Sequence, residues 1–114
     1  MTTRRRSLGL AVVRGRSMEP TLLEGDRLLV LYAVPPRRGG LALVRLPDGP
    51  DGPRPLAVKR VHRREADGWW VEGDNLGAGV DSWTVGTLPD SGMVARVLLR
   101  LPRRGRLARG GRRE

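Results

Sequence analysis

Glycine and proline recur so often in this 114-residue chain that long helices are excluded. The sequence contains 16 Gly and 9 Pro, which divide the apolar residues into short runs. Both residues are unfavourable inside helices and strands and are common in turns. No run of about 11 or more residues combines a helical period with caps. We therefore predict a small, mainly β protein, built as a β-barrel or a folded sheet with irregular loops.

Six short apolar runs are candidate strands. They span residues 8–13, 26–34, 41–46, 56–65, 68–73 and 91–101. The fourth and fifth runs are separated only by Ala66 and Asp67, with Gly68 next, which predicts a β-hairpin. A chain of this length is typical of one domain, which we place at residues 8–101.

The net charge of +10 lies at the two ends of the chain. Residues 1–16 hold five Arg and no acidic residue, and residues 102–114 hold six Arg and one Glu. The body between them has eleven basic and eleven acidic residues. We interpret residues 1–7 and 102–114 as basic tails, the second one disordered, that are able to contact a membrane surface weakly. A neutral body argues against nucleic-acid binding.

The chain has no Cys and a single His. Disulfides, thiolate metal sites and thiol nucleophiles are therefore excluded, and a zinc site built by the protein is not expected. We expect no metal and no cofactor. The apolar run at 8–13 is too short to span a membrane, which takes about 20 residues, and its flanks do not fit a signal peptide. The expected location is the cytoplasm.

Lys59 is the only Lys in a chain with 21 Arg. Chance alone leaves an occasional Lys in such a composition. However, an amine can be made neutral by burial, whereas a guanidinium stays protonated. Lys59 shares one face of its strand with Ala57 and Val61, and an apolar setting lowers the pKa of a lysine from about 10.4. Lys59 is therefore a candidate general base.

Ser17 lies in the loop "GRSMEPTLLEGD", between two predicted strands. Pro20 fixes its own φ and keeps Glu19 out of the helical region. A serine on such a turn suits a nucleophile, although an ordinary surface turn has the same features. A serine nucleophile needs a base. His62 precedes two Arg at a strand end, where an exposed or satisfied His is expected, so Lys59 is the remaining choice.

Four motifs in order carry a resemblance to a known family. They are "SMEPT", "GDRLLV", "VKRV" and "EGDNLGAGVDSWTVG", and together they cover residues 15–86. This pattern resembles the S24/S26 serine peptidases, and in particular the type I signal peptidase family. The resemblance implies a Ser–Lys peptidase domain over residues 8–101.

The resemblance also implies a role for individual residues. Ser17 matches the nucleophile and its backbone N–H an oxyanion-hole donor, Lys59 matches the general base, and Ser82 matches a serine that orients the lysine. The residues that shape the nucleophile turn or the last motif are Met18, Pro20, Asp74, Asn75 and Asp81.

The chain departs from the family pattern at several positions. Gly15 stands where some members have a hydroxyl that assists the oxyanion hole, and Gly79 stands where Ser is common. Trp83 stands where Arg is frequent, so no salt bridge is expected from that position to Asp74 or Asp81. From this sequence we expect no amino-terminal membrane anchor of the kind that signal peptidases have.

A subgroup of the family fits the expected absence of an anchor, the length, the Arg-rich composition and "GWWVEGDN" at residues 68–75. These are the nickel-type superoxide dismutase maturation proteases. The resemblance implies an endopeptidase that removes an amino-terminal extension from the superoxide dismutase precursor, with nickel belonging to the substrate. An extended peptide with small side chains near the scissile bond is expected to add to a strand edge near Ser17.

Three alternatives remain at this stage. The first is a signal-peptidase-like protease of exported precursors. The second is a self-cleaving repressor domain, for which the 16 residues before Ser17 leave no room for a DNA-binding domain. The third is a basic, β-rich nucleic-acid-binding module, which needs aromatic and basic residues interleaved on a strand. Trp69 and Trp70 instead predict one ring in the core and one on a surface such as the substrate groove.

Overall fold

The computed structural model describes residues 5–102, so most of the predicted tails, residues 1–4 and 103–114, lies outside the described residues. Six strands make up nearly all of the regular structure, which confirms a mainly β protein. They are β1 (Ser7–Val12), β2 (Arg27–Tyr32), β3 (Leu41–Val44), β4 (Ala57–Glu65), β5 (Gly68–Glu72) and β6 (Met93–Arg100). Each lies within one or two residues of a predicted run, and β1 begins one residue earlier than expected.

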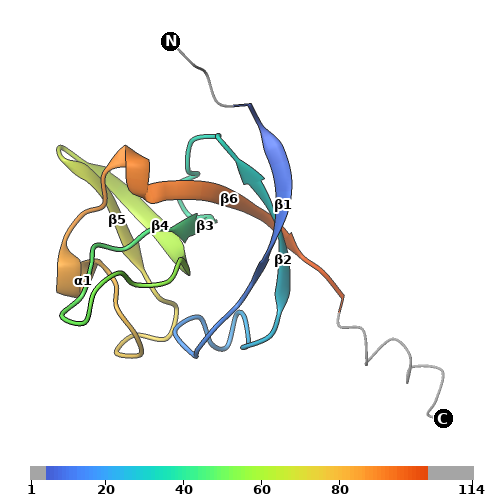
Figure 1. Cartoon of the computed structure of the whole chain (residues 1–114), viewed down its shortest axis with the longest axis horizontal. Helices are drawn as coiled ribbons and strands as arrows, with labels where there is room; N and C mark the ends of the chain where they lie inside the picture. The colour runs from blue at the N-terminus through green and yellow to red at the C-terminus, as the bar shows by residue number, and fades with distance from the viewer. Residues whose placement is uncertain (1–4, 103–114) are drawn as a thin grey trace.

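The six strands form one antiparallel sheet in the order β1-β2-β6-β3-β4-β5. Strand β6 pairs with β2 through its second half and with β3 through its first half. It therefore joins the β1–β2 pair to the β3–β4–β5 half (Figure 1). Strands β1 and β5 are the two edges and do not pair with each other. The prediction of a folded sheet is therefore confirmed. The alternative of a closed barrel is wrong, because the edge strands β1 and β5 do not pair.

The connection between β4 and β5 agrees with the sequence-based prediction, whereas two other connections contain helical turns that were not predicted. Glu65 pairs with Gly68 across a two-residue turn, so the predicted β4–β5 hairpin is confirmed. Two short helical turns were not expected: α1 (Ser82–Val85) and a 3-10 turn, η1 (Asp90–Gly92). No helix among residues 5–102 is long and apolar enough to cross a bilayer.

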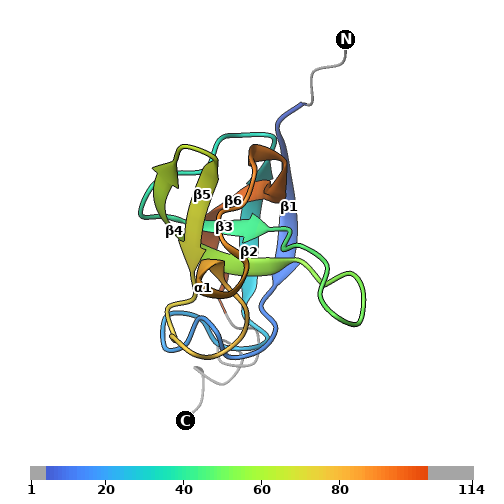
Figure 2. The ribbon, with the colours of Figure 1, turned by 90° about the vertical axis from the view of Figure 1, so that its left-hand side faces the viewer.

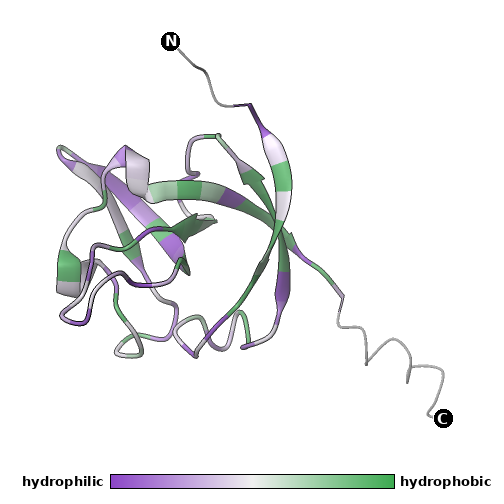
Figure 3. Ribbon diagram, in the orientation of Figure 1, coloured by the Kyte–Doolittle hydropathy of each residue, from purple (hydrophilic) through white to green (hydrophobic). Residues whose placement is uncertain are grey.

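Apolar side chains form two clusters on the folded sheet. The first contains Val13, Met18, Leu22, Leu28, Val30, Leu43, Val58 and Ala95, and the second contains Ala42, Val44, Leu46, Val61, Val71 and Leu88. Strand β4 contributes to both clusters because alternate residues face opposite sides. Figure 3 shows the contrast between apolar β2 and β3 and the polar outer end of the β4–β5 hairpin.

Two loops lie side by side at one end of the molecule. One joins β1 to β2 and carries the predicted nucleophile, and the other follows β5 at residues 73–81. Both appear at the lower end of the molecule in Figures 1 and 2. The N–H of Asn75 donates to the carbonyl of Ser17 at 2.8 Å, which joins the two loops directly.

Candidate active site

Ser17 lies on a turn that is held in place by a buried neighbouring side chain. Its neighbour Met18 is 1% exposed and packs in the first apolar cluster. The N–H of Glu19 donates to the Arg16 carbonyl at 3.2 Å, which closes the turn around Ser17. Ser17 itself is half-buried, and its N–H has no acceptor among residues 5–102. The turn therefore presents both a hydroxyl and an unused backbone donor.

The loop at residues 73–81 holds the serine turn by its backbone. Besides the bond to the Ser17 carbonyl, Asn75 donates its Nδ2 to the Arg16 carbonyl at 2.9 Å. The N–H of Asp74 points at Met18 Sδ at 3.4 Å. The carbonyls on both sides of the nucleophile's N–H are thus fixed, which limits rotation of this peptide.

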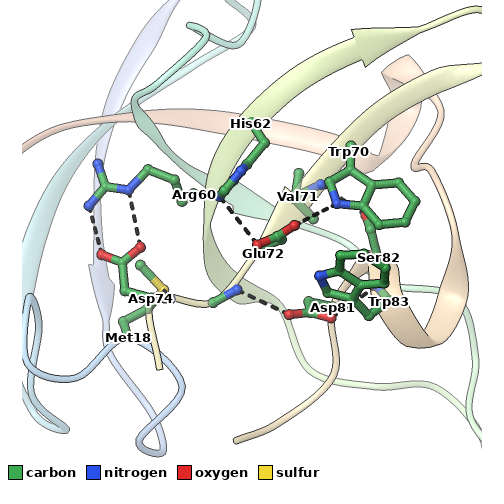
Figure 4. A network of polar contacts seen from close by, with 11 residues as sticks. Met18, Arg60, His62, Trp70, Val71, Glu72, Asp74, Asp81, Ser82 and Trp83 are labelled. Carbon is green, nitrogen blue, oxygen red and sulfur yellow. Dashed lines mark hydrogen bonds and ion pairs between the residues drawn. The ribbon is translucent and has the colours of Figure 1, made fainter. Parts of the chain in front are cut away.

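Asp74 is the centre of a charged network next to the site (Figure 4). Arg60 donates to it from Nε at 3.2 Å and from Nη2 at 2.7 Å, and Thr21 donates its hydroxyl at 2.6 Å. The hydrogen bond from Arg60, aided by that from Thr21, holds the pKa of Asp74 below its usual value despite burial. Arg60 follows Lys59, and Thr21 follows the serine turn. The network therefore ties the segments of Ser17 and Lys59 to one carboxylate.

Two glycines let the loop approach the serine closely. A Cβ on Gly73 would lie 2.6 Å from the Ser17 carbonyl oxygen. Gly79 has a φ of +85°, and a Cβ there would lie 3.2 Å from the Ser17 Cβ. Side chains at these positions would displace the nucleophile. The family pattern commonly has Ser at the position of Gly79. In this chain the close approach to Ser17 and the positive φ explain why the residue is glycine.

Lys59 is almost completely buried. Its side chain is 2% exposed, and its cross-strand partner Ala42 and strand neighbours Ala57 and Val61 all belong to or pack on the second apolar cluster. Burial lowers the pKa of Lys59, and the nearby carboxylate of Asp81 opposes this without reversing it. No hydrogen bond or ion pair joins its amine to another residue in the range 5–102. This is the environment of an amine that gives up its proton readily.

The Lys59 amine and the Ser17 hydroxyl both lie close to Gly79. A Cβ on Gly79 would lie 3.7 Å from Lys59 Nζ and 3.8 Å from Ser17 Oγ. The two reactive atoms therefore flank the same backbone position, although 42 residues separate them in the chain.

Asp81 and Ser82 accept backbone hydrogen bonds from the end of β5 and from the residue that follows it. Asp81 Oδ1 caps α1 by accepting the Trp83 N–H at 3.0 Å, and its Oδ2 accepts the Gly73 N–H at 3.3 Å. Ser82 is 2% exposed, and its Oγ accepts the Val71 N–H at 2.9 Å. A lysine-orienting role for Ser82 stays a prediction.

The other polar and aromatic candidates lie away from the pair. His62 is exposed, with Nε2 at 3.6 Å from Glu72 Oε1. Trp69 packs on the second cluster, and Trp70 contacts Trp83 edge to face at 5.2 Å. Neither Trp69 nor Trp70 lines the cleft at Ser17.

A cleft of about 480 Å³ contains the predicted nucleophile and base. Its walls are formed by residues 12–18, residues 54–59 and residues 78–80, together with Leu43 and Leu46. Ser17 and Lys59 both line it. A hydroxyl beside a poorly solvated amine suits acyl transfer. Among residues 5–102, no group of three or more His, Asp or Glu side chains is placed to hold a metal ion.

The model of the family described as Peptidase S24-like matches residues 1–79. The chain belongs to the Peptidase S24-like family. Membership supports a serine-peptidase type of function. The match includes the segments of Ser17 and Lys59 and ends before Asp81 and Ser82. Comparisons with curated proteins and with solved structures find no match.

Sequence reasoning missed two residues of the site. Arg60 and Thr21 bind Asp74, although a salt bridge to this carboxylate was sought only from position 83. Arg60 supplies it instead, and Trp83 is 70% exposed. Arg60 belongs to the motif "VKRV" and Thr21 to "SMEPT". Their presence in these motifs was the sequence feature that could have indicated a role. The walls of the cleft come from segments distant in sequence, so no local pattern indicated them.

Proposed function

We propose that the chain is a serine endopeptidase with a Ser17–Lys59 dyad. One observation carries this proposal: a buried amine without an ion-pair partner and a serine hydroxyl flank the same backbone position in one cleft. A structural lysine would be expected to reach solvent or a carboxylate, because burying an unpaired charge is costly.

The reaction follows from the roles of these atoms. Neutral Lys59 Nζ accepts the proton of Ser17 Oγ as the oxygen attacks the scissile carbonyl carbon. The Ser17 N–H donates to the developing oxyanion. The protonated amine then gives its proton to the leaving nitrogen as the C–N bond breaks. Water, deprotonated by Lys59, hydrolyses the acyl-enzyme, and the proton returns to Oγ. In this scheme Ser82 helps to orient the lysine.

We propose a protein precursor as the substrate, bound in an extended conformation. Strand β1 pairs only with β2 among the described strands, and its last residue Val12 lines the cleft. A peptide that pairs with the open edge of β1 would be led to Ser17. The resemblance at residues 68–75 supports the precursor of nickel superoxide dismutase as that substrate, with its amino-terminal extension removed in the cytoplasm.

A second candidate function is processing of exported precursors. It is favoured by alternate residues of β1 that are exposed: Leu8 is 63%, Leu10 62% and Val12 45% exposed. An apolar stripe near Arg5 and Arg6 suits contact with an anionic membrane surface.

The test is to incubate the purified protein with the nickel superoxide dismutase precursor and, separately, with an exported precursor. The new amino termini are then sequenced. We expect a single cut in the dismutase precursor that is lost in a folded Ser17→Ala variant. Cleavage of the exported precursor alone would favour the second candidate. Full cleavage by Ser17→Ala would contradict the dyad.

A further inference from the structure

The charged side chains that line the cleft are all basic. Three arginine side chains line it, those of Arg14, Arg16 and Arg54, and no Asp or Glu does. By contrast, residues 17–101 as a whole carry equal numbers of basic and acidic residues. The acidic residues of the body are therefore placed elsewhere, and the site where a substrate would bind is positive.

Two of these arginines have unused donors. Arg14 is exposed and makes no hydrogen bond or ion pair with any residue in the range 5–102. Arg54 donates Nη1 to the Pro47 carbonyl at 2.9 Å, which leaves its other N–H groups available. Arg16 pairs with Glu19 at 3.3 Å, and its side chain is 76% exposed. Such an exposed pair is weak and does not neutralise the region.

Arg14 and Arg54 come from two different segments of the cleft lining. Arg14 follows β1 on the wall at residues 12–18, and Arg54 precedes β4 on the wall at residues 54–59. Between them the cleft is lined by apolar residues, including Leu43, Leu46 and Val58. An apolar floor lowers the local dielectric, so a charge on a bound peptide interacts more strongly there than in water. The guanidinium fork also matches a carboxylate.

We propose that the cleft selects peptides that carry an Asp or Glu within a few residues of the scissile bond, next to an apolar side chain. This proposal rests on the proposed peptidase function and names its substrate class. An acidic side chain would bind Arg14 or Arg54 while the apolar one enters the cleft. A basic side chain at the same position would be repelled.

The first experiment profiles cleavage in a library of tryptic peptides from a bacterial proteome. We expect Asp or Glu to be enriched at one or more positions within four residues of the cut, a window set by the reach of an extended chain, about 3.3 Å per residue. A synthetic peptide with the preferred acid is then compared with its Asn or Gln isostere. We expect kcat/KM to fall about tenfold for the isostere. Equal rates for the two peptides would overturn the proposal.

The second experiment changes the enzyme. Arg14→Glu should shift the preference from acidic toward basic residues, and Arg54→Gln should reduce it. Arg37→Gln is the matched control, because Arg37 is exposed in the turn between β2 and β3 and does not line the cleft. Thermal melting of each variant checks the fold. An unchanged preference in folded Arg14→Glu and Arg54→Gln would contradict the assignment of these arginines.

Binding separates failure of this proposal from failure of the peptidase function. Ser17→Ala is titrated with the acidic peptide and its isostere at low and at high salt. Tighter, salt-sensitive binding of the acidic peptide supports the proposal even if no peptide is cut. Absence of cleavage contradicts the peptidase function alone, and equal binding of both peptides contradicts the selectivity alone.

Discussion

Arg60 and Lys59 are adjacent on β4, but the protein treats their charges in opposite ways. Arg60 binds Asp74 at 2.7 Å, and this hydrogen bond raises the pKa of Arg60. Lys59 is 2% exposed and has no such partner within residues 5–102, and burial lowers the pKa of Lys59. A paired cation stabilises the fold, whereas a buried, unpaired amine costs stability and favours the neutral form. The comparison supports a structural role for Arg60 and the proposed catalytic role for Lys59.

Lys59→Arg gives the largest effect, because it keeps the charge and removes the proton acceptor. We expect kcat/KM to fall by at least about 10³-fold, as for removal of a member of a catalytic triad. Cleavage of the precursor is the measurement. Since a buried Arg threatens folding, Lys59→Met provides a second variant that suits the apolar surroundings. An active Lys59→Arg enzyme would mean that the lone lysine has no catalytic role.

Asp74→Asn removes the charge that Arg60 needs. We expect the free energy of unfolding to fall by about 1–3 kcal/mol, because a partly buried guanidinium loses its carboxylate. The folded-state pKa of Asp74 is lowered, so its stabilisation is complete above its unfolded pKa and is lost as pH falls through the folded pKa. Denaturant unfolding of both proteins at several pH values is the measurement. A difference that persists at the lowest pH would contradict this account.

Lys59→Met is expected to raise the free energy of unfolding by about 1–2 kcal/mol near neutral pH, since it removes a buried charge. The folded-state pKa of Lys59 lies below its unfolded value of 10.5. The cost of burying the Lys59 charge in the wild-type protein is therefore complete below the folded-state pKa. It disappears as pH rises toward the unfolded-state pKa. Stability curves against pH show whether the gain shrinks in this window. A destabilised variant would indicate a structural lysine.

His62→Gln should have the smallest effect. His62 is exposed, contacts Glu72 and does not line the cleft. We expect kcat/KM to change by less than about twofold, because surface substitutions away from a site are usually near neutral. A large loss, with the pH profile displaced, would assign the base to the histidine.

The strands were predictable because turn residues bound them and the apolar pattern is local. The β4–β5 hairpin follows from a two-residue gap, and the single lysine was visible as a compositional exception. The short α1 turn was not predictable, since it depends on the Asp81 cap and on packing against β5. Nor was the Arg60–Asp74–Thr21 network, in which 53 residues separate Thr21 from Asp74. Its partners meet only after the sheet has folded.

The direct test of the central claim is the titration of Lys59 itself. Because the chain has one Lys, selective ¹³C labelling of lysine gives a single Cε signal without assignment. We expect this signal in the folded protein to titrate below 10.5, with kcat/KM rising over the same pH range. A signal that titrates at or above 10.5 in the folded protein would show a charged lysine and contradict the Ser17–Lys59 dyad.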